Sequence, residues 1–382
     1  MNSFYELFAG GGMARLGLGP NWRCLFANDF DAKKADAYAQ NFGGKQLRVD
    51  DVANVTASDL PDRADLLWAS FPCQDLSLAG KGVGLCGERS GAFWQVSRLL
   101  SELRAQDRQP SIVVLENVVG ALSSNNGQDF AQIADSLRQN GYRFGAMVLD
   151  AVHFVPQSRP RLFIVAVLPE LAPELAIQSG LERSGPCAHW HPNRLVEAKL
   201  SLPKSCQENW IWWNLPTPPK RTQVFADLID TESPSIAWHT AEETQRLLDM
   251  MSPVNREKVW VAQRSGKPCV GGIYRRTRLG VQRAEVRFDD VAGCLRTASG
   301  GSSRQSILVV DGSSVRSRLL ATREAARLMG LPETYSLPVN YNEAYSLAGD
   351  GLVVPVVRFL SRHLLTPLVS QALLSERLSV AA

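Results

Sequence analysis

Cysteine, glutamate and arginine residues of the kinds used in covalent catalysis stand in three short motifs of this chain. Cys73 lies in WASFPCQDL, Glu116 lies in SIVVLENV, and QSRPR supplies Gln157, Arg159 and Arg161. A thiolate can attack an electrophilic carbon while a carboxylic acid neutralises the charge that develops, and arginines can bind a phosphate or the reacting group. Each residue alone has an equally good structural interpretation, such as a buried, inert thiol. Their positions in the fold therefore decide between the two.

A glycine-rich turn near the N-terminus has the composition of a nucleotide-binding loop. In FAGGGMARLGL, Gly10, Gly11 and Gly12 allow the backbone to turn tightly and to approach a ligand before a helix begins. Asp29 and Phe30 end the next apolar run, where an acid commonly bonds ribose hydroxyls and an aromatic ring can pack on adenine. Together they indicate an adenosine-containing cofactor, and the chain has no Walker motif that would favour ATP.

The elements that must position these residues alternate up to about residue 169. Apolar runs with the length of strands are 4–10, 22–29, 64–70, 111–118, 145–152 and 161–168, and helical segments between them are 35–42, 93–106 and 129–141. This alternation predicts a mostly parallel, doubly wound α/β sheet, whose ligands bind beyond the carboxyl ends of the strands. The glycine, cysteine and glutamate motifs all stand at such ends.

The middle of the chain has a different composition and carries a basic cluster. Residues 170–318 are rich in Trp, Pro and Gly without an α/β rhythm, which indicates a separate, irregular, partly β domain. Residues 256–304 contain eleven basic and four acidic residues, a balance of +7, although the whole chain carries only +3. A solvated surface is one interpretation. A phosphate-binding surface is the more specific one, and its candidate contacts are Arg275, Arg276, Arg278 and Arg283.

Length, composition and cysteine content exclude several classes of protein. The chain has 382 residues, 45% of them hydrophobic and 21% charged, which is ordinary for a soluble protein of more than one domain. No membrane span or signal peptide is recognised, so we expect a cytoplasmic protein. Seven scattered cysteines without a CxxC pair argue against a disulfide framework. Cys187, His189, His191 and Cys206 are conceivable metal ligands, but their spacing matches no ligand pattern and we expect no metal.

Six motifs occur in the order in which DNA (cytosine-5) methyltransferases have them. They are FAGGG, FPCQ, ENV, QSRPR, RLLATREAARLMGLP and AYSLAGDGLVVPVV, and they extend from Phe8 to about Val357. The chain therefore resembles this family, in its prokaryotic restriction-modification or orphan form. The resemblance implies a Rossmann-like, S-adenosylmethionine-dependent methyltransferase domain. It also implies that the basic middle is a smaller, irregular target-recognition domain.

The resemblance places S-adenosylmethionine at the glycine-rich end of the sheet. It implies that Asp29 bonds the ribose, that Phe30 packs against adenine and that Asp51 lies near the adenine amino group. The other cofactor-binding residues that it implies are Phe8, Gly10, Gly12, Val52, Pro72, Asp350 and Leu352.

The same resemblance implies a covalent reaction at cytosine. Cys73 would add to C6 while Glu116 protonates or hydrogen-bonds N3, which makes C5 nucleophilic enough to take the methyl group from the sulfonium. Arg159 and Arg161 would hold the target cytosine and its backbone, and Gln157 belongs to the same catalytic motif.

Double-stranded DNA is the partner that the resemblance implies. Because C6 is unreachable inside a duplex, the cytosine must be flipped out of the helix. Arg89, in the glycine-rich loop after the cysteine, suits a phosphate, and Thr297, Gly300 and Gly301 would lie near the flipped nucleotide. Arginine commonly reads guanine, so we expect a G-containing site. A monomer is expected without membrane attachment, and a cognate restriction endonuclease is left open.

These assignments divide the chain into four parts. We expect the cofactor-binding and catalytic domain in 1–170, target recognition in 171–320, a supporting hinge in 321–348 and a C-terminal segment in 349–382 that packs back on the catalytic domain.

Two departures from the family pattern and four alternative functions stay open. Met13 stands where a second glycine is usual, and Asp350 stands where the family commonly has asparagine, which could alter the choice of cofactor. A cytosine C5 alkyltransferase with a modified cofactor is one alternative. The others are a tRNA cytosine-5 methyltransferase, whose Cys-Phe-Thr tripeptide is absent, a catalytically silent DNA-binding protein and, least favoured, a small-molecule methyltransferase.

Overall fold

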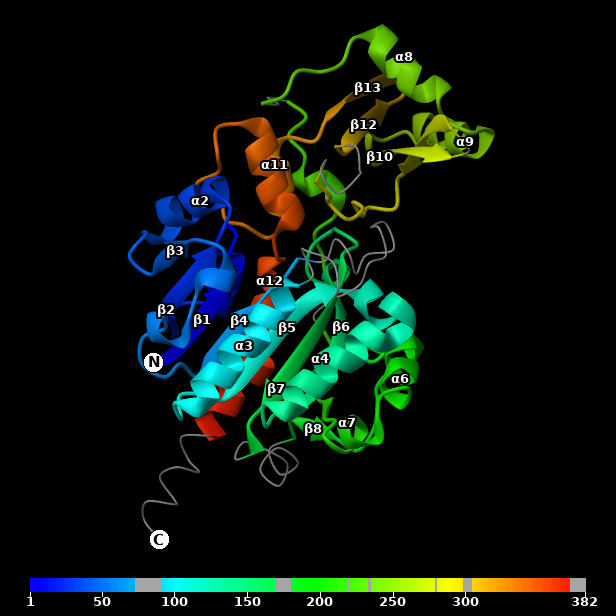
Figure 1. Cartoon of the computed structure of the whole chain (residues 1–382). Helices are drawn as coiled ribbons and strands as arrows, with labels where there is room; N and C mark the ends of the chain where they lie inside the picture. Colours follow the sequence, from blue (N-terminus) through cyan, green and yellow to red (C-terminus); the bar gives the residue numbers. More distant parts are fainter. Residues whose placement is uncertain are drawn as a thin grey trace. The chain divides into compact units, whose positions relative to one another are not determined.

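The chain forms two compact units in a computed structural model (Figure 1). The first comprises Met1–Leu149, Pro160–Thr217 and Val356–Ala382, and the second comprises Asp150–Arg159 and Pro218–Pro355. The structure describes residues 1–72, 91–169, 180–218, 220–232, 235–278, 280–297 and 304–371. Cys73, Arg89, Gly300 and Gly301 lie outside the described residues, as does the side chain of Arg278.

A seven-stranded sheet forms the centre of the first unit, in the order β3-β2-β1-β4-β5-β7-β6. β1 pairs in parallel with β2 and β4, and β4 with β5, whereas β7 is antiparallel to β5. The mostly parallel α/β sheet expected from the sequence is therefore confirmed. The strands are β1 (Asn2–Leu7), β2 (Trp22–Asp29), β3 (Leu47–Val49), β4 (Leu66–Ala69), β5 (Ile112–Val118), β6 (Arg143–Asp150) and β7 (Pro160–Val167).

Amphipathic helices cover the sheet. α3 buries Phe93, Val96, Leu99, Leu100 and Leu103, a spacing of three to four residues that places one apolar stripe on the strands. Figure 1 shows α3 and α4 crossing one face of the sheet, and the core there continues through apolar residues of α4. The helices of this unit are α1 (Met13–Leu18), α2 (Ala32–Phe42), α3 (Ala92–Ala105), α4 (Gln128–Gln139), α6 (Asn193–Leu200), α7 (Lys204–Glu208) and α12 (Val354–Leu360), which enters it from the second unit.

The Trp-rich segment packs with the first unit, although the sequence indicated that it starts the recognition domain. Residues 180–217 contain β8 (Glu182–Arg183) and β9 (Trp212–Trp213), and the Ile211 N–H donates to the Phe144 carbonyl of β6 over 2.7 Å. Gly145 permits this approach, because a Cβ there would lie 1.9 Å from the Ile211 carbonyl oxygen. The units are defined by packing, so the functional boundaries at 170, 320 and 348 stay predictions.

The second unit contains a four-stranded antiparallel sheet in the order β11-β10-β12-β13. Its core joins Leu247 and Val259 of the helices to Ile273, Val286 and Leu308 of the sheet. This sheet corresponds to the partly β domain expected from the sequence. Its strands and helices are β10 (Cys269–Arg278), β11 (Val281–Arg287), β12 (Ser306–Asp311), β13 (Ser314–Leu319), α8 (Ala241–Asp249), α9 (Pro253–Gln263), α10 (Thr322–Leu328) and α11 (Tyr341–Asp350).

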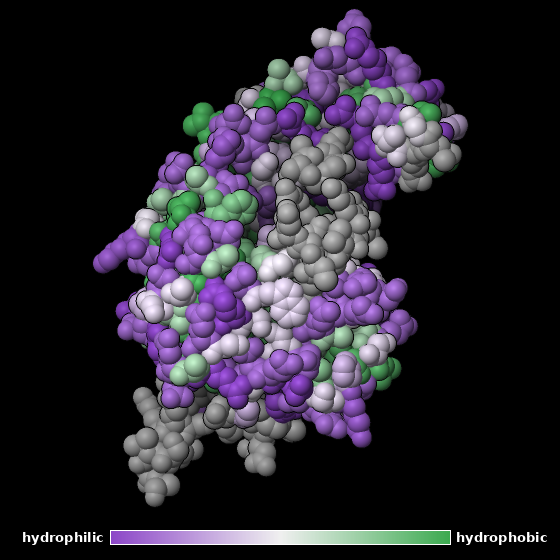
Figure 2. Space-filling view, viewed as in Figure 1, coloured by the Kyte–Doolittle hydropathy of each residue, from purple (hydrophilic) through white to green (hydrophobic). Residues whose placement is uncertain are grey.

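The visible surface is mainly hydrophilic, and the hydrophobic residues on it lie in small separate groups (Figure 2). One stretch, Tyr341–Gln371, is long and apolar enough to cross a membrane by length and composition alone. However, 67% of its most apolar window is buried inside the structure, which is typical of a core helix.

Candidate functional site

The glycine-rich turn after β1 has a left-handed backbone and an open surface. Phe8, Gly10 and Gly12 have φ values of 58°, 54° and 75°. A Cβ at Gly12 would lie 2.4 Å from the Phe42 ring, so this position excludes any side chain. At Gly10 the place of a Cβ has no described neighbour within 4 Å, which leaves room for a ligand against the backbone.

Asp29 and Phe30 stand beside this turn at the end of β2. The Asp29 carboxylate accepts hydrogen bonds from the N–H groups of Gly10 (2.7 Å) and Asp31 (2.9 Å). Asp29 is 7% exposed, and burial raises its pKa despite these bonds. Phe30 is 70% exposed, which is unusual for a large aromatic residue and suits the stacking of a flat ligand. The structure thus brings Gly10 and Asp29 together by a direct bond.

Glu6 lies buried on β1, just before the same turn, and belongs to no sequence motif. It is 1% exposed, and its Oε2 has no hydrogen-bond partner among the described residues. Burial raises the pKa of Glu6 to about 8. The backbone N–H and the guanidinium of Arg15 stabilise the carboxylate and oppose this rise, whereas the charge of nearby Asp29 adds to it. Glu6 therefore holds a proton in the folded protein near neutral pH.

Glu6→Gln is expected to remove a pH dependence of stability. The folded pKa of about 8 lies above the ordinary 4.5, so the contribution of Glu6 is fully present below pH 4.5 and is lost as the pH rises through about 8. The thermal midpoint of the wild type should therefore fall relative to that of the variant between pH 5 and 8.5. Glu208→Gln, at an exposed position, is the control. If the thermal midpoints of the wild type and of Glu6→Gln changed with pH in parallel, the raised pKa of Glu6 would be contradicted.

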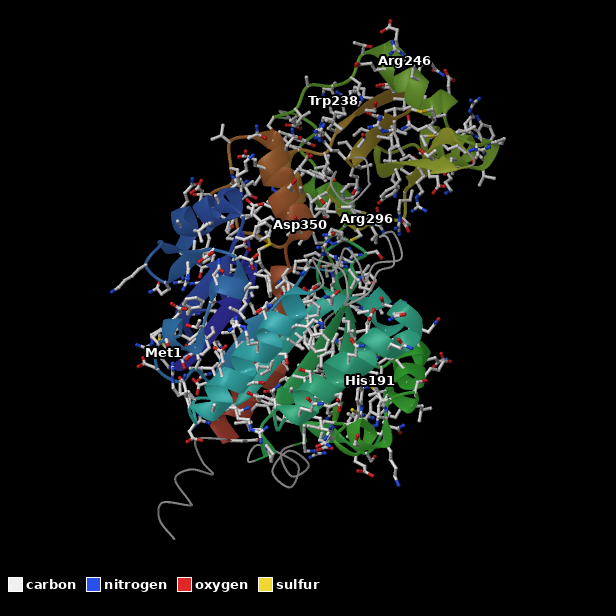
Figure 3. The ribbon with its side chains drawn as sticks, viewed as in Figure 1. Met1, His191, Trp238, Arg246, Arg296 and Asp350 are labelled. Atoms are coloured by element: carbon white, nitrogen blue, oxygen red, sulfur yellow. The ribbon has the colours of Figure 1, made fainter. Side chains whose placement is uncertain are left out.

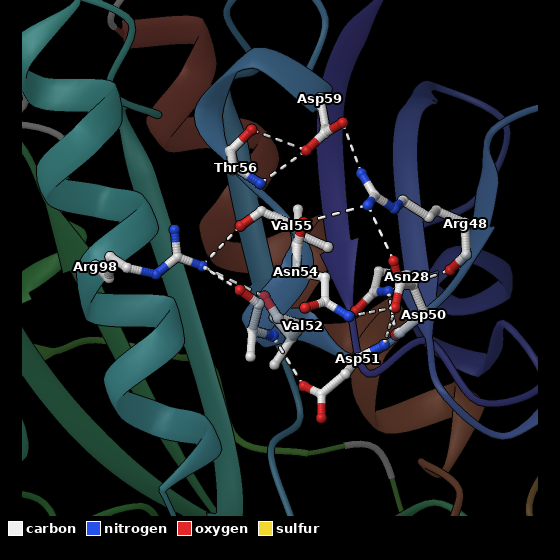
Figure 4. Close-up of polar contacts among 11 residues, drawn as sticks. Asn28, Arg48, Asp50, Asp51, Val52, Asn54, Val55, Thr56, Asp59 and Arg98 are labelled. Atoms are coloured by element: carbon white, nitrogen blue, oxygen red, sulfur yellow. Dashed lines mark hydrogen bonds and ion pairs between the residues drawn. The ribbon is translucent and has the colours of Figure 1, made fainter.

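The segment from Asp50 to Asp59 forms the next side of the candidate site (Figure 4). It contains two single 3-10 turns, Val52–Asn54 and Ala57–Asp59, and the Asp51 carboxylate caps the first by accepting from the Ala53 N–H over 2.8 Å. Asp51 is exposed, whereas Val52 is buried. Asn28 of β2 donates to the carbonyl of Asp50 over 2.9 Å, which ties this segment to the strand that ends at Asp29.

The chain before the cysteine motif is tied to the end of β5. The Asn117 amide donates to the Phe71 carbonyl over 3.2 Å, and both residues are buried. Glu116 Oε1 lies 3.3 Å from Arg161 Nε, and the side chains are 11% and 17% exposed. Arg161 stands opposite Val118 in the β5–β7 register, so its partner Glu116 is the diagonal neighbour on the same sheet face. Pro72 is half-buried. It follows Phe71, which is hydrogen-bonded to Asn117, the residue next to Glu116 in the chain.

Gln157 and Arg159 lie in the second unit and bond to backbone there. Gln157 is 0% exposed; its amide donates to the Leu328 carbonyl over 2.8 Å and accepts from the Leu295 N–H over 3.1 Å. Arg159, 3% exposed, donates to the carbonyls of Leu295 (2.9 Å), Gly349 (2.9 Å) and Gly351 (2.8 Å). These bonds hold backbone segments of the second unit in place. Direct contact of Arg159 with a base stays a prediction.

The end of α11 lies against the segment that carries Thr297. A Cβ at Gly349 would be 3.1 Å from Thr297 Cγ2, and Thr297 is 6% exposed. Figure 3 shows Asp350 and Arg296 at the same end of this unit, and both are exposed. Leu352, which follows α11, is buried. Arg159 therefore connects the two segments through their carbonyl groups.

The β10–β11 hairpin places the clustered arginines on different faces of the sheet. Arg276 stands directly opposite Arg283, both exposed, whereas Arg275 stands opposite the buried Ala284. Because side chains alternate along a strand, Arg275 is on the other sheet face from the Arg276–Arg283 pair. Glu285 lies 3.8 Å from Arg276. Arg278 occupies the last position of β10, opposite Val281.

The conceivable metal ligands do not form a cluster within the described part of the chain. His191 Nδ1 accepts a hydrogen bond from the Cys187 N–H over 3.0 Å, and its ring packs edge-on against Trp212. Burial, followed by the charge of Arg183, lowers the pKa of His191 to about 4. No group of three or more His, Cys, Asp or Glu side chains suited to a metal occurs among the described residues.

Comparisons with known proteins match most of the chain. The family model for the C-5 cytosine-specific DNA methylase matches residues 2–366. The type II methyltransferase M.HaeII of Haemophilus aegyptius is 27% identical over 365 residues, which cover 95% of this chain and 92% of that protein. M.BsuFI of Bacillus subtilis is 38% identical over 171 residues, 44% of this chain and 40% of its own length.

The fold also matches solved structures. That of the Schizosaccharomyces pombe Dnmt2 methyltransferase has a TM-score of 0.59 at 17% identity and covers 96% of this chain and 99% of its own. This likeness concerns the fold alone.

Proposed function

Because the chain belongs to the C-5 cytosine-specific DNA methylase family, we propose that it transfers a methyl group from S-adenosylmethionine to C5 of cytosine in duplex DNA. The bond from Asn117 to the Phe71 carbonyl carries the proposal. It fixes the residue two positions before Cys73 at the strand end that presents Glu116 and Arg161. With Cys73 next in the chain after Pro72, the proposal assigns a nucleophile, an acid and a cation to this edge of the sheet.

The turn after β1 has the properties that S-adenosylmethionine requires. Gly10 leaves room for the ligand, the buried Asp29 carboxylate suits ribose hydroxyls, and the exposed Phe30 ring suits adenine. Asp51 and Val52 would face the edge of the base. When bound, the cofactor supplies an electrophilic methyl group on a sulfonium. The chain's own residues hold it, with Asp29 at the ribose and Asp51 at the adenine amino group.

The residues at the end of β5 would activate the cytosine ring. The Cys73 thiolate would form a bond to C6, and Glu116 would supply a proton or hydrogen bond at N3. The electron pair that reaches C5 would accept the methyl group while the bond from that methyl to the sulfonium sulfur breaks and leaves a neutral thioether. Loss of the C5 proton to a base and elimination of the thiolate then restore the aromatic ring. Arg161 holds the Glu116 carboxyl in place through their 3.3 Å contact.

The Arg276–Arg283 pair is the best-supported DNA-binding feature of the second unit. Two like charges directly opposite each other destabilise an antiparallel pair, and Glu285 lies 3.8 Å from the Arg276 member of this pair. Binding of a polyanion relieves this repulsion and releases counterions. We therefore assign the exposed face of this hairpin to the phosphate backbone. A single catalytic unit can modify each strand in separate events, so the proposed enzyme needs no second subunit.

Arg276→Ala with Arg283→Ala is expected to weaken duplex binding at every sequence and to flatten its salt dependence. Each phosphate contact contributes a slope of about one in log K against log salt, so the double variant should lose about two. Fluorescence anisotropy at four salt concentrations measures both quantities. Arg246→Ala, an exposed position on α8, removes a charge elsewhere in the same unit and should leave the slope unchanged. An unchanged slope in the double variant would show that this face does not bind DNA.

Nucleoside mass spectrometry of DNA from cells that express the protein tests the proposed function. 5-Methylcytosine that appears only with the wild type, and not with Cys73→Ser, is the expected result. A heavier cytosine adduct would indicate a modified cofactor and would make Asp350 the residue to examine. If 5-methylcytosine appeared in tRNA instead of DNA, tRNA would be the substrate and the proposed DNA substrate would be wrong. Absence of modified bases with soluble protein would favour a silent DNA-binding protein.

A further inference from the structure

Arg98 of α3 binds the segment that carries Asp51, although no sequence motif includes this arginine. Its Nη2 donates to the carbonyls of Val55 (2.7 Å), Val52 (3.4 Å) and Ala53 (3.5 Å), at the end of the first 3-10 turn. Carbonyl groups at the end of a helical turn lack partners within the turn. The Val52 carbonyl also accepts from the Val55 N–H over 3.1 Å, so the guanidinium mainly adds a partner for the carbonyls of Ala53 and Val55 at the end of the turn.

The Arg98 side chain is itself held in place from two sides. Its Nε donates to Gln95 Oε1 over 2.9 Å, and its Nη1 donates to Glu102 Oε1 over 2.5 Å. The second oxygen of Glu102 accepts from the Ala57 N–H over 2.9 Å, at the start of the next turn. Burial would raise the pKa of Glu102, but the Ala57 N–H and Arg98 together lower it, which keeps the carboxylate charged. One face of α3 thus binds both turns of the segment.

A second arginine holds the other side of the segment. Arg48, one residue before the end of β3, donates to Asp50 (2.9 Å) and to the Asn54 carbonyl (3.2 Å), and its Nη1 lies 2.6 Å from Asp59. Figure 4 shows the Arg48 and Arg98 guanidinium groups on opposite sides of the segment. The backbone of Asp51 and Val52 lies between them. Its position consequently depends on side chains from two different elements.

We propose that Arg98 is a positioning residue for adenine recognition, acting through Asp51 and Val52. The inference rests on the proposed binding of S-adenosylmethionine. A three-residue turn has few hydrogen bonds of its own, so its orientation relative to the glycine-rich turn is set by external contacts. Without the Arg98 contacts, the carbonyl groups of this turn are no longer held by α3 and the turn can reorient. The Asp51 carboxylate is then no longer held where the adenine amino group would bind.

Adenine discrimination in an Arg98→Gln variant tests the proposal. Binding of S-adenosylmethionine and of the analogue with hydrogen in place of the 6-amino group is measured by isothermal titration calorimetry on the full chain. The wild type should prefer the natural cofactor about tenfold, which corresponds to about 1.4 kcal/mol. In Arg98→Gln the cofactor should bind about tenfold more weakly and the preference should fall to less than about threefold. A uniformly damaged protein would lose affinity for both ligands equally.

Arg104→Gln is the matched control on the same helix. Arg104 donates to the Gln139 carbonyl, away from the Asp51 segment, so both affinities should stay at wild-type values. An Arg98→Gln variant that keeps the wild-type preference overturns the role of Arg98 while the proposed function stands. A wild type that binds neither ligand overturns both, and a wild type that binds both equally overturns adenine recognition by Asp51 together with the inference.

Discussion

Cys73→Ser is expected to reduce DNA methylation by about 10⁴-fold or more, while the affinities for S-adenosylmethionine and duplex DNA stay close to those of the wild type. A serine hydroxyl has a far higher pKa than a thiol and is a poor nucleophile towards C6, and removal of a covalent nucleophile typically costs this much or more. Single-turnover transfer of a radiolabelled methyl group measures the loss. Neither binding step uses the thiol, so kcat should fall with little change in KM.

Cys187→Ser is the control for this substitution. Cys187 is a partly exposed thiol in the first unit, and its bonds to His191 use its backbone N–H and carbonyl groups, which a serine keeps. A second measurement tests the covalent bond itself. With 5-fluorocytosine in the duplex, C5 cannot lose a proton, so the wild type should remain attached to DNA under denaturing conditions and Cys73→Ser should not. A Cys73→Ser variant with substantial activity would show that another group attacks C6.

The α/β sheet could be predicted from the sequence because its signals are local. Buried strands begin as continuous apolar runs, such as IVVL at the start of β5, and the helices between them have apolar residues at a spacing of three to four. The expectation that Phe8, Asp29 and Glu116 stand at strand ends follows from the same runs. β3 was missed because three residues, LRV, are too short to show a period.

The packing of the Trp-rich segment could not be predicted in this way. Its attachment to β6 depends on a backbone bond between Ile211 and Phe144 and on the missing side chain at Gly145, residues more than sixty positions apart. Nothing in the local composition of ENWIWWNL distinguishes a core segment from a recognition surface. The buried Trp190 and Trp213 show that these side chains fill the interior of the first unit.

The candidate site was predictable in its motif residues but not in its supporting contacts. Arg98 and Asn117 act through carbonyl groups of residues 43 to 46 positions away, and such contacts leave no periodic trace in a single sequence. The faces of the β10–β11 hairpin likewise depend on register. A shift by one residue would exchange Arg275 with Arg276, so only the observed pairing of Arg276 with Arg283 identifies the exposed pair.

Glu116→Gln is expected to lower kcat by about 10³-fold with little change in the affinity for the cofactor. Positioned acids contribute about 10²–10⁴-fold, and glutamine has nearly the size of glutamate but cannot deliver a proton to N3. Its amide oxygen can still accept from Arg161, so the 3.3 Å contact and the local packing are conserved. The loss should therefore appear in the rate of methyl transfer and not in stability.

Two comparisons separate this role of Glu116 from a structural one. Glu208→Gln, at an exposed position on α7, makes the same chemical change and should leave kcat unaltered. Attack at C6 needs charge neutralisation at N3, so Glu116→Gln should also form the denaturation-resistant complex with 5-fluorocytosine DNA much more slowly than the wild type. If adduct formation kept the wild-type rate while methyl transfer fell, Glu116 would act after the attack of Cys73, and N3 would obtain its proton elsewhere.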